Sequence, residues 1–182
     1  NEASPLAKLH VKVADSGASA YAHSALFIED SDHTFIDIMS GTTGSGGINF
    51  GDSGNAQRGV VEYNHSSDYM RFITAQGERL RIESSGQVGI GTTNPDGNLH
   101  VYNGTAGSVT AASDANELVL ESAANVGMSF LTGATSISRI KFGTATANNR
   151  GVIAYRHADD AFTFTTNGDG EKVRITSVGY IG

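Results

Sequence analysis

The alternation of apolar and polar residues along the chain is typical of short β-strands. In residues 7–13 (AKLHVKV), Leu9, Val11 and Val13 alternate with polar residues, which is the two-residue period of a strand with one buried face. Similar apolar runs recur as ALFIE, FIDIM, GVVEY, YMRFI and RLRIE, most of them bounded by Gly, Ser, Asn or Asp. Strands at this spacing predict an all-β fold.

The sequence repeats itself with a period of about 92 residues. Residues 25–75 align without gaps on residues 117–167, with fifteen identical positions. SPLAKLHV aligns with NPDGNLHV at an offset of 90, and GERLRIESSGQVG aligns with GEKVRITSVGYIG at an offset of 93. Because a fixed period identifies repeated structural units, we predict two tandem β-modules, residues 1–93 and 94–182. The first ends in a Gly-rich connector, and the second is truncated within the same connector.

Both ends of the chain fall at nearly the same point of this period. The second copy stops inside the phrase that reads GQVGIGTTNP in the first copy, and the chain begins with Asn1 instead of Met. We therefore expect a fragment or a processed chain, with further modules on both sides.

The composition suggests that such modules need partners. The chain has 182 residues, of which 38% are hydrophobic and 8% aromatic, with 23 Gly and 2 Pro. Many tight turns and a thin core follow from these numbers, and short helical turns are expected at most in the Ala-rich stretches 18–25 and 111–115. Unpaired strand edges promote association, and winding identical chains around a common axis would cover both the edges and the apolar faces. We expect a homo-oligomer.

Charge and residue usage exclude several classes of function. The formal net charge is −7, with 12 basic and 19 acidic residues, and the basic residues are scattered, which argues against nucleic acid as a partner. There are no cysteines, so disulfides, thiolate metal sites and Cys nucleophiles are excluded. No apolar run has the length of a membrane helix, and the first residues lack the pattern of a signal peptide. We expect no membrane insertion.

Two segments of the chain resemble the repeating shaft modules of tailed-bacteriophage tail fibres, of the kind found upstream of an intramolecular chaperone (endosialidase-type) domain. They run from Arg58 to Val101 and from Arg150 to Gly182. In that family a VGIGTT-P-LHV phrase recurs between modules, and here it reads VGIGTTNPDGNLHV at residues 88–101. The resemblance implies an elongated, intertwined homotrimeric fibre of the extracellular virion. Its partners would be its own copies and neighbouring fibre modules. The chaperone sequence is absent from these residues, so its self-cleavage does not carry over.

The phrase has a physical interpretation of its own. Gly86, Gly89 and Gly91 lack Cβ atoms, which permits positive φ, bulges and the close approach of three backbones where one module narrows to the next. Pro95 blocks continued ladder pairing and stiffens the entry to the next strand. We expect a narrow, rigid connector.

Three residue types that suggest catalysis occur in both copies at the same spacing. They are Tyr63, His65 and Asp68, repeated as Tyr155, His157 and Asp160. We interpret them as parts of a hairpin with a turn at residues 66–68, in which Asp68 accepts hydrogen bonds from turn amides and His65 lies beside it.

His10 and His100 lie on the polar faces of equivalent strands. Threefold symmetry could gather each of them into a metal site on the axis, but no second ligand lies two residues away. We therefore favour histidines packed or solvated between chains.

Several acidic positions superficially suggest calcium. They are Asp30, Asp32, Asp37 and the NGDGE loop Asn167–Glu171. None has the spacing of an EF-hand loop, so we favour turns and solvated faces. The Gly-rich stretch Gly41–Gly47 (GTTGSGG) lacks the order of a phosphate-binding loop, and no G-x-S-x-G elbow is present. We assign no catalytic, cofactor-binding or metal-binding residue and expect no cofactor.

The favoured function is structural, a rigid trimeric shaft that serves host attachment and is not an enzyme. An alternative is an adhesin whose loops, Ser40–Gly47 and Thr144–Asn149, bind host surface glycans, since loops on a rigid scaffold often carry binding residues. A polysaccharide depolymerase ranks last, because it would need two carboxylates across a groove.

Overall fold

The computed structural model describes residues 8–168 and 170–182. These residues form strands, turns and loops and contain no helix, so the prediction of an all-β fold is confirmed. Contacts divide the chain into two compact units, Asn1–Ala124 and Asn125–Gly182, which are described separately below. The start of the SPLAKLHV segment and Asp169 lie outside the described residues.

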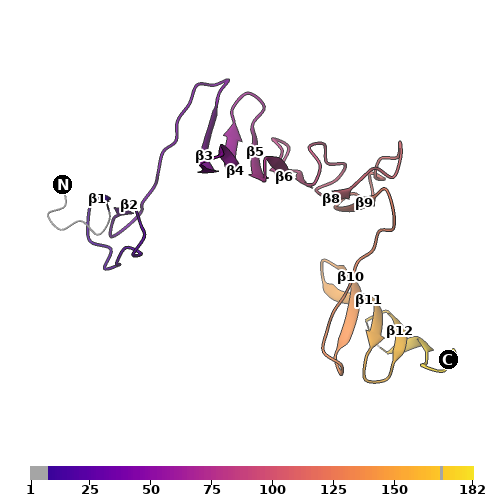
Figure 1. Ribbon diagram of the computed structural model, residues 1–182. Helices are drawn as coiled ribbons and strands as arrows, with labels where there is room; N and C mark the ends of the chain where they lie inside the picture. The colour runs from indigo at the N-terminus through magenta and orange to yellow at the C-terminus, as the bar shows by residue number, and fades with distance from the viewer. Residues whose placement is uncertain (1–7, 169) are drawn as a thin grey trace. The chain divides into compact units, whose positions relative to one another are not determined.

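From residue 8 on, where the structure describes it, the first unit contains nine strands in two sheets (Figure 1). The strands are β1 (Leu9–Lys12), β2 (Leu26–Glu29), β3 (Ser45–Asp52), β4 (Asn55–Asn64), β5 (Tyr69–Thr74), β6 (Gly77–Ile82), β7 (Val88–Ile90), β8 (Leu99–Asn103) and β9 (Leu118–Ser122). Strands β1 and β2 form a two-stranded parallel sheet, in which Leu9 is paired with Leu26.

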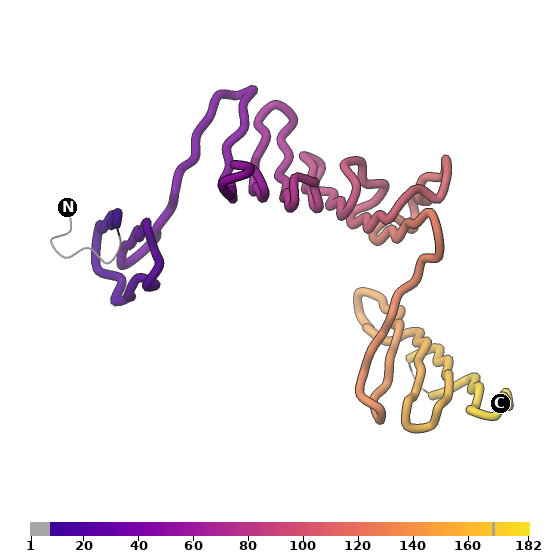
Figure 2. Tube along the Cα trace, viewed as in Figure 1, coloured from indigo at the N-terminus to yellow at the C-terminus, as the bar shows by residue number. Residues whose placement is uncertain are grey.

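Strands β3 to β9 form one sheet in which every strand pairs with the next strand along the chain. The pairing is antiparallel from β3 to β7 and parallel from β7 through β8 to β9. Figure 2 shows the backbone of residues 45–122 winding through these successive strands. The result is a stacked, β-solenoid-like series whose contacts are mostly between neighbours in sequence.

The described residues of the second unit, all but Asp169, form an antiparallel sheet of four strands in chain order. They are β10 (Ile137–Thr144), β11 (Ala147–Arg156), β12 (Ala161–Thr166) and β13 (Glu171–Ile175). An isolated bridge joins Ile175 to Ile181.

The strand pairings recur with the period of the sequence. Ser45 pairs with Asn64 in the first unit, and Ile137 pairs with Arg156 in the second, 92 residues later in both strands. The sequence boundary at residue 93 lies inside the seven-stranded sheet, because Val88 before it pairs with Leu99 after it. The compact units instead part between residues 124 and 125, and the module boundary stays a prediction from the sequence repeat.

One face of the seven-stranded sheet is apolar from end to end. Directly paired residues lie on the same face of a sheet, so the register assigns this face to Ile48, Phe50, Val61, Met70, Phe72, Leu80, Ile82, Val88, Ile90, Leu99, Val101, Leu118 and Leu120. Much of it is uncovered, and Phe50 is 60% exposed. We call these residues the apolar face of the first unit.

The second unit has an equivalent apolar face. Its residues are Ile140, Phe142, Ile153, Phe162, Phe164, Val173 and Ile175. Phe142 is 55% exposed and Phe162 is 47% exposed. Among the described residues, the buried hydrophobic side chains are Val60, Ala154 and Ala161. The expected thin core is therefore present, and most of the apolar surface faces outward from the chain.

Three local expectations differ from the structure. The FIDIM segment at residues 35–39 is not a strand, although it lies against β3, since a Cβ at Gly46 would meet the Ile38 carbonyl. In β1 the apolar residues are exposed and His10 is buried, so the buried face is the polar one. The Ala-rich stretches form single turns, closed by bonds such as Ala115 N to Ala112 O (3.0 Å), and no helical turn.

The Gly-rich phrase after β6 makes its close approaches within the chain. Gly86 and Gly91 have φ of +86° and +79°, the left-handed region that favours glycine. A Cβ on Gly91 would collide with the Tyr102 carbonyl oxygen, and one on Gly89 with the Thr92 carbonyl oxygen. Positive φ and close approaches within one chain account for these glycines, and the convergence of three backbones stays a prediction.

Candidate functional site

The hairpin between β4 and β5 brings Tyr63, His65 and Asp68 together. The Tyr63 hydroxyl donates to Asp68 Oδ1 at 3.0 Å, and the rings of Tyr63 and His65 meet edge to face with centroids 5.0 Å apart. Asp68 has a φ of +52°, which Asp tolerates in turns. The hydrogen bond to Asp68 raises the pKa of Tyr63. This carboxylate therefore holds the phenol in its protonated form, which does not suit a general base.

The predicted role of Asp68 was wrong in one respect. The turn amide of Ser67 donates to Asn64 Oδ1 at 3.1 Å, while Asp68 accepts from the Tyr63 hydroxyl. Asn64 is the residue that caps the turn, and Asp68 fixes the tyrosine across it.

The second copy repeats this arrangement. Tyr155 donates to Asp160 Oδ1 at 3.2 Å, and its ring lies edge to face against His157 at 5.0 Å. His157 Nε2 also lies 3.3 Å from Ser138 Oγ. Because the same Tyr–Asp bond and Tyr–His ring contact span the turn in both copies, the arrangement is best explained as a structural hairpin clamp.

His10 is paired with a glutamate of the neighbouring parallel strand. Its Nε2 lies 2.9 Å from Glu29 Oε1, and both side chains are almost completely buried. Glu29 also accepts from the Ser16 amide at 3.0 Å and the Ser16 hydroxyl at 2.7 Å, and Lys12 Nζ is 3.3 Å away. The bonds from Ser16, with smaller contributions from Lys12 and His10, lower the pKa of Glu29 to about 2.

His100 makes the equivalent pair with Glu121. The two atoms His100 Nε2 and Glu121 Oε2 are 3.2 Å apart, and the Ala106 amide donates to Glu121 Oε1 at 2.6 Å. His100 is 2% exposed. Ala106 thus occupies the place of Ser16, and the buried His–Glu pair is common to both copies. The expectation that these histidines lie between chains is corrected, because each is enclosed by its own chain.

Asp96, His100 and Glu121 are also the one group in the described part of the chain whose donor atoms lie close enough for a metal ion, within 4.8 Å of one another. The Asp96 amide, however, donates to His100 Nδ1 at 3.2 Å. This bond places the ring proton of a neutral imidazole on Nε2, facing Glu121. A histidine that binds metal through Nε2 carries its proton on Nδ1, so the bond from Asp96 favours a close His–Glu pair over a metal centre, although the pair lacks the geometry of a hydrogen bond.

The other acidic positions do not converge. Asp30 accepts from the Ser31 amide at 2.6 Å, and Asp32 lies 2.7 Å from His33 Nδ1 with both side chains largely exposed. In the Asn167–Glu171 loop, Glu171 pairs with Arg174 at 2.7 Å, and Asp169 lies outside the described residues. Turn and surface roles explain the acids that are described.

The two loops of the adhesin alternative are shorter than their sequences suggested. In Ser40–Gly47, a turn closed by Gly44 N to Gly41 O (2.8 Å) leads into β3 at Ser45. In Thr144–Asn149, strand β11 already begins at Ala147. The hairpin tip itself is residues 145–146.

A polar hollow that the sequence did not indicate lies over β4 and β5. Its lining residues are Asn55, Gln57, Val60, Glu62, Arg71, Ile73 and Gln76. Val60 and Glu62 pair with Asn49 and Gly47 of β3, so the hollow lies on the face of the sheet opposite the apolar face. The cross-strand register was needed to find it, because its residues come from two strands and from the turn after β5.

No helix in the described part of the chain has the length and apolarity to span a bilayer. Comparisons with protein families, with curated proteins and with solved structures give no match.

Proposed function

We propose that this chain forms part of the rigid shaft of a tailed-bacteriophage tail fibre, as a homotrimer of tandem β-modules that serves host attachment. The observation that carries the proposal is the exposed apolar face on each unit. A contiguous exposed apolar face of this kind marks an interaction site. Copies of the same chain are the partners we assign to it.

The energetics of small units support an oligomer. The second unit has 58 residues, 125–182, and units below roughly 70 to 80 residues rarely gain enough stability from one core. Small proteins compensate with disulfides, metals or oligomerisation. The chain has no cysteine, and the surroundings of His100 do not favour a metal. Association is the remaining means of stabilisation.

The resemblance to tail-fibre modules favours three chains over two. The structural repetition of pairings, hairpin clamp and His–Glu pair agrees with a shaft, since a rigid rod requires the same unit many times. These features have structural explanations in both copies, which supports a non-enzymatic role in the virion.

Small-angle X-ray scattering combined with electron microscopy tests the proposal. We expect rods whose cross-section contains three chains. Compact monomeric particles would refute the shaft. Release of oligosaccharides from host polysaccharide over time would refute the non-enzymatic role.

A further inference from the structure

The hairpin clamp and the His–Glu pair occur in both copies of the repeat. The polar side chains that line the polar hollow occur only in the first copy. Its central pair is Glu62 and Arg71, which face each other directly across β4 and β5. Arg71 Nη2 donates to both carboxylate oxygens of Glu62, at 3.0 and 3.1 Å. In the second copy Ala154 and Thr163 stand at these positions, and both are buried.

The amide side chains around this pair also change between copies. Asn55, Gln57 and Gln76 correspond to Ala147, Asn149 and Gly168 at the offset of 92. The strand pairing is the same in both copies, whereas the polar side chains of the hollow differ. The fold therefore does not require these side chains.

The lining is rich in neutral groups that both donate and accept hydrogen bonds. Gln57 and Gln76 are exposed, and the described residues offer their side chains no hydrogen-bond partner. Asn55 accepts from the Gln57 amide through Oδ1 at 2.7 Å, and its NH₂ group has two further hydrogens to donate. Each primary amide supplies two donors and an acceptor.

The charges of the hollow cancel. Glu62 and Arg71, the two charged residues of the lining, pair with each other, and Arg71 also lies 3.5 Å from Glu78, which pairs with Arg81 at 2.6 Å. A charged ligand would therefore gain little net attraction. A ligand with many hydroxyl groups would find complementary partners, because hydroxyls also donate and accept.

We propose that this hollow binds a neutral saccharide. Its amide groups would hold the sugar hydroxyls, and the Glu62–Arg71 pair would form the polar floor beside the Val60–Ile73 pair. The proposal goes beyond the shaft function, and it requires only that this face of the first unit stays open to solvent.

The experiment is saturation-transfer difference NMR on the whole chain with glucose, galactose, N-acetylglucosamine, lactose and cellobiose, and with glucuronate as a charged probe. The test variant is Gln57→Ala/Gln76→Ala, two exposed side chains whose loss leaves the strand pairings intact. The matched control is Asn149→Ala, the position equivalent to Gln57 in the second copy.

We expect saturable binding of at least one neutral sugar, weakened roughly tenfold or more by the double substitution and unchanged in Asn149→Ala. The proposal is overturned if no neutral sugar saturates, if glucuronate binds more tightly than the neutral sugars, or if the double variant binds as well as the parent. Equal weakening in Asn149→Ala would also overturn it. The mass of each sample in solution is measured alongside, so that a failure of sugar binding is distinguished from a failure of trimer formation.

Discussion

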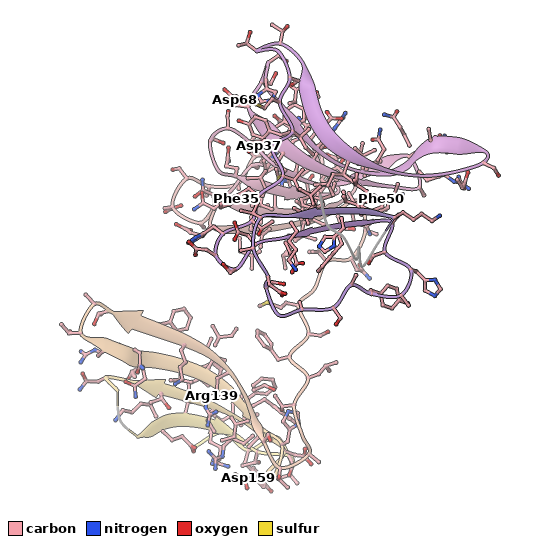
Figure 3. All side chains as sticks on the ribbon, turned by 90° about the vertical axis from the view of Figure 1, so that its left-hand side faces the viewer. Phe35, Asp37, Phe50, Asp68, Arg139 and Asp159 are labelled. Carbon is pink, nitrogen blue, oxygen red and sulfur yellow. The ribbon has the colours of Figure 1, made fainter. Side chains whose placement is uncertain are left out.

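Replacing Phe50 by alanine tests whether copies of the chain cover the apolar face. Phe50 lies in β3 (Figure 3) and packs over Gly59 of β4 while 60% of its surface remains exposed. If no copy of the chain covers this face, the substitution removes a ring that mostly faces solvent, and the oligomeric state does not change. In a trimer the same ring would be buried.

The size of the effect follows from the exposed fraction. Complete burial of a phenylalanine side chain is worth about 1.5–3 kcal/mol, so covering the exposed 60% is worth about 1–2 kcal/mol per chain. Three chains together lose about 3–5 kcal/mol, which raises the dissociation constant of the trimer roughly 10²- to 10⁴-fold.

Sedimentation velocity over a range of concentrations measures this shift. Asn49→Ala is the matched control, because Asn49 is the preceding residue on the opposite face of the same strand, and it should leave dissociation unchanged. Circular dichroism checks that both variants keep the strand content of the parent. If Phe50→Ala dissociates no more readily than Asn49→Ala, the apolar face is not the interface.

Three further predictions concern the stability of the chain. Because the folded pKa of Glu29 is lowered to about 2 from 4.5, its stabilising effect is complete above pH 4.5 and is lost as the pH falls towards 2. Urea unfolding at several pH values should show the difference in unfolding free energy between parent and Glu29→Gln closing over that interval. A difference that is constant with pH would contradict the assignment. Gly91→Ala should destabilise more than Gly86→Ala in thermal unfolding, because Gly86→Ala meets open space and costs only about 1–2 kcal/mol for its positive φ, whereas Gly91→Ala also collides with a carbonyl; equal losses would refute the close approach. His100→Ala should cost about 1–3 kcal/mol in urea unfolding, because it removes a buried ring and the histidine partner of Glu121, which keeps only the Ala106 amide. A neutral result would show that the pair contributes nothing to the fold.

The strand pattern could be predicted because alternation reports directly on a two-sided sheet. The runs around Leu26, Val60, Phe72 and Leu80 all became strands. FIDIM failed because an extended segment that lies across a sheet face has the same sequence pattern as a strand within it. The two cases differ only in whether the backbone pairs with a neighbouring strand. The pairing strand is distant in sequence, so the local pattern does not reveal it.

The direction of burial in β1 could not be predicted from hydrophobicity. Leu9 and Val11 belong to a face that the single chain leaves open, whereas His10 is enclosed because Glu29 approaches it from the parallel strand. The relevant signal was present in the sequence, since the histidine recurs after 90 residues and the glutamate after 92. A recurrent acid and a recurrent base that keep a nearly constant separation indicate a conserved contact.

The polar hollow was out of reach of sequence reasoning for a different reason. Its residues are separated along the chain, and their significance comes from the contrast with Ala154 and Thr163 at the equivalent positions. Identical positions identified the repeat, but differing positions identified the candidate binding site. The cross-strand register was required before those differences could be placed on one surface.

Sedimentation equilibrium of the intact chain at micromolar concentration tests the central claim most directly. The account predicts one species of three times the 18.9 kDa chain mass, since the apolar faces of both units need copies of the chain to cover them. A stable, monodisperse species of 18.9 kDa under the same conditions would contradict it.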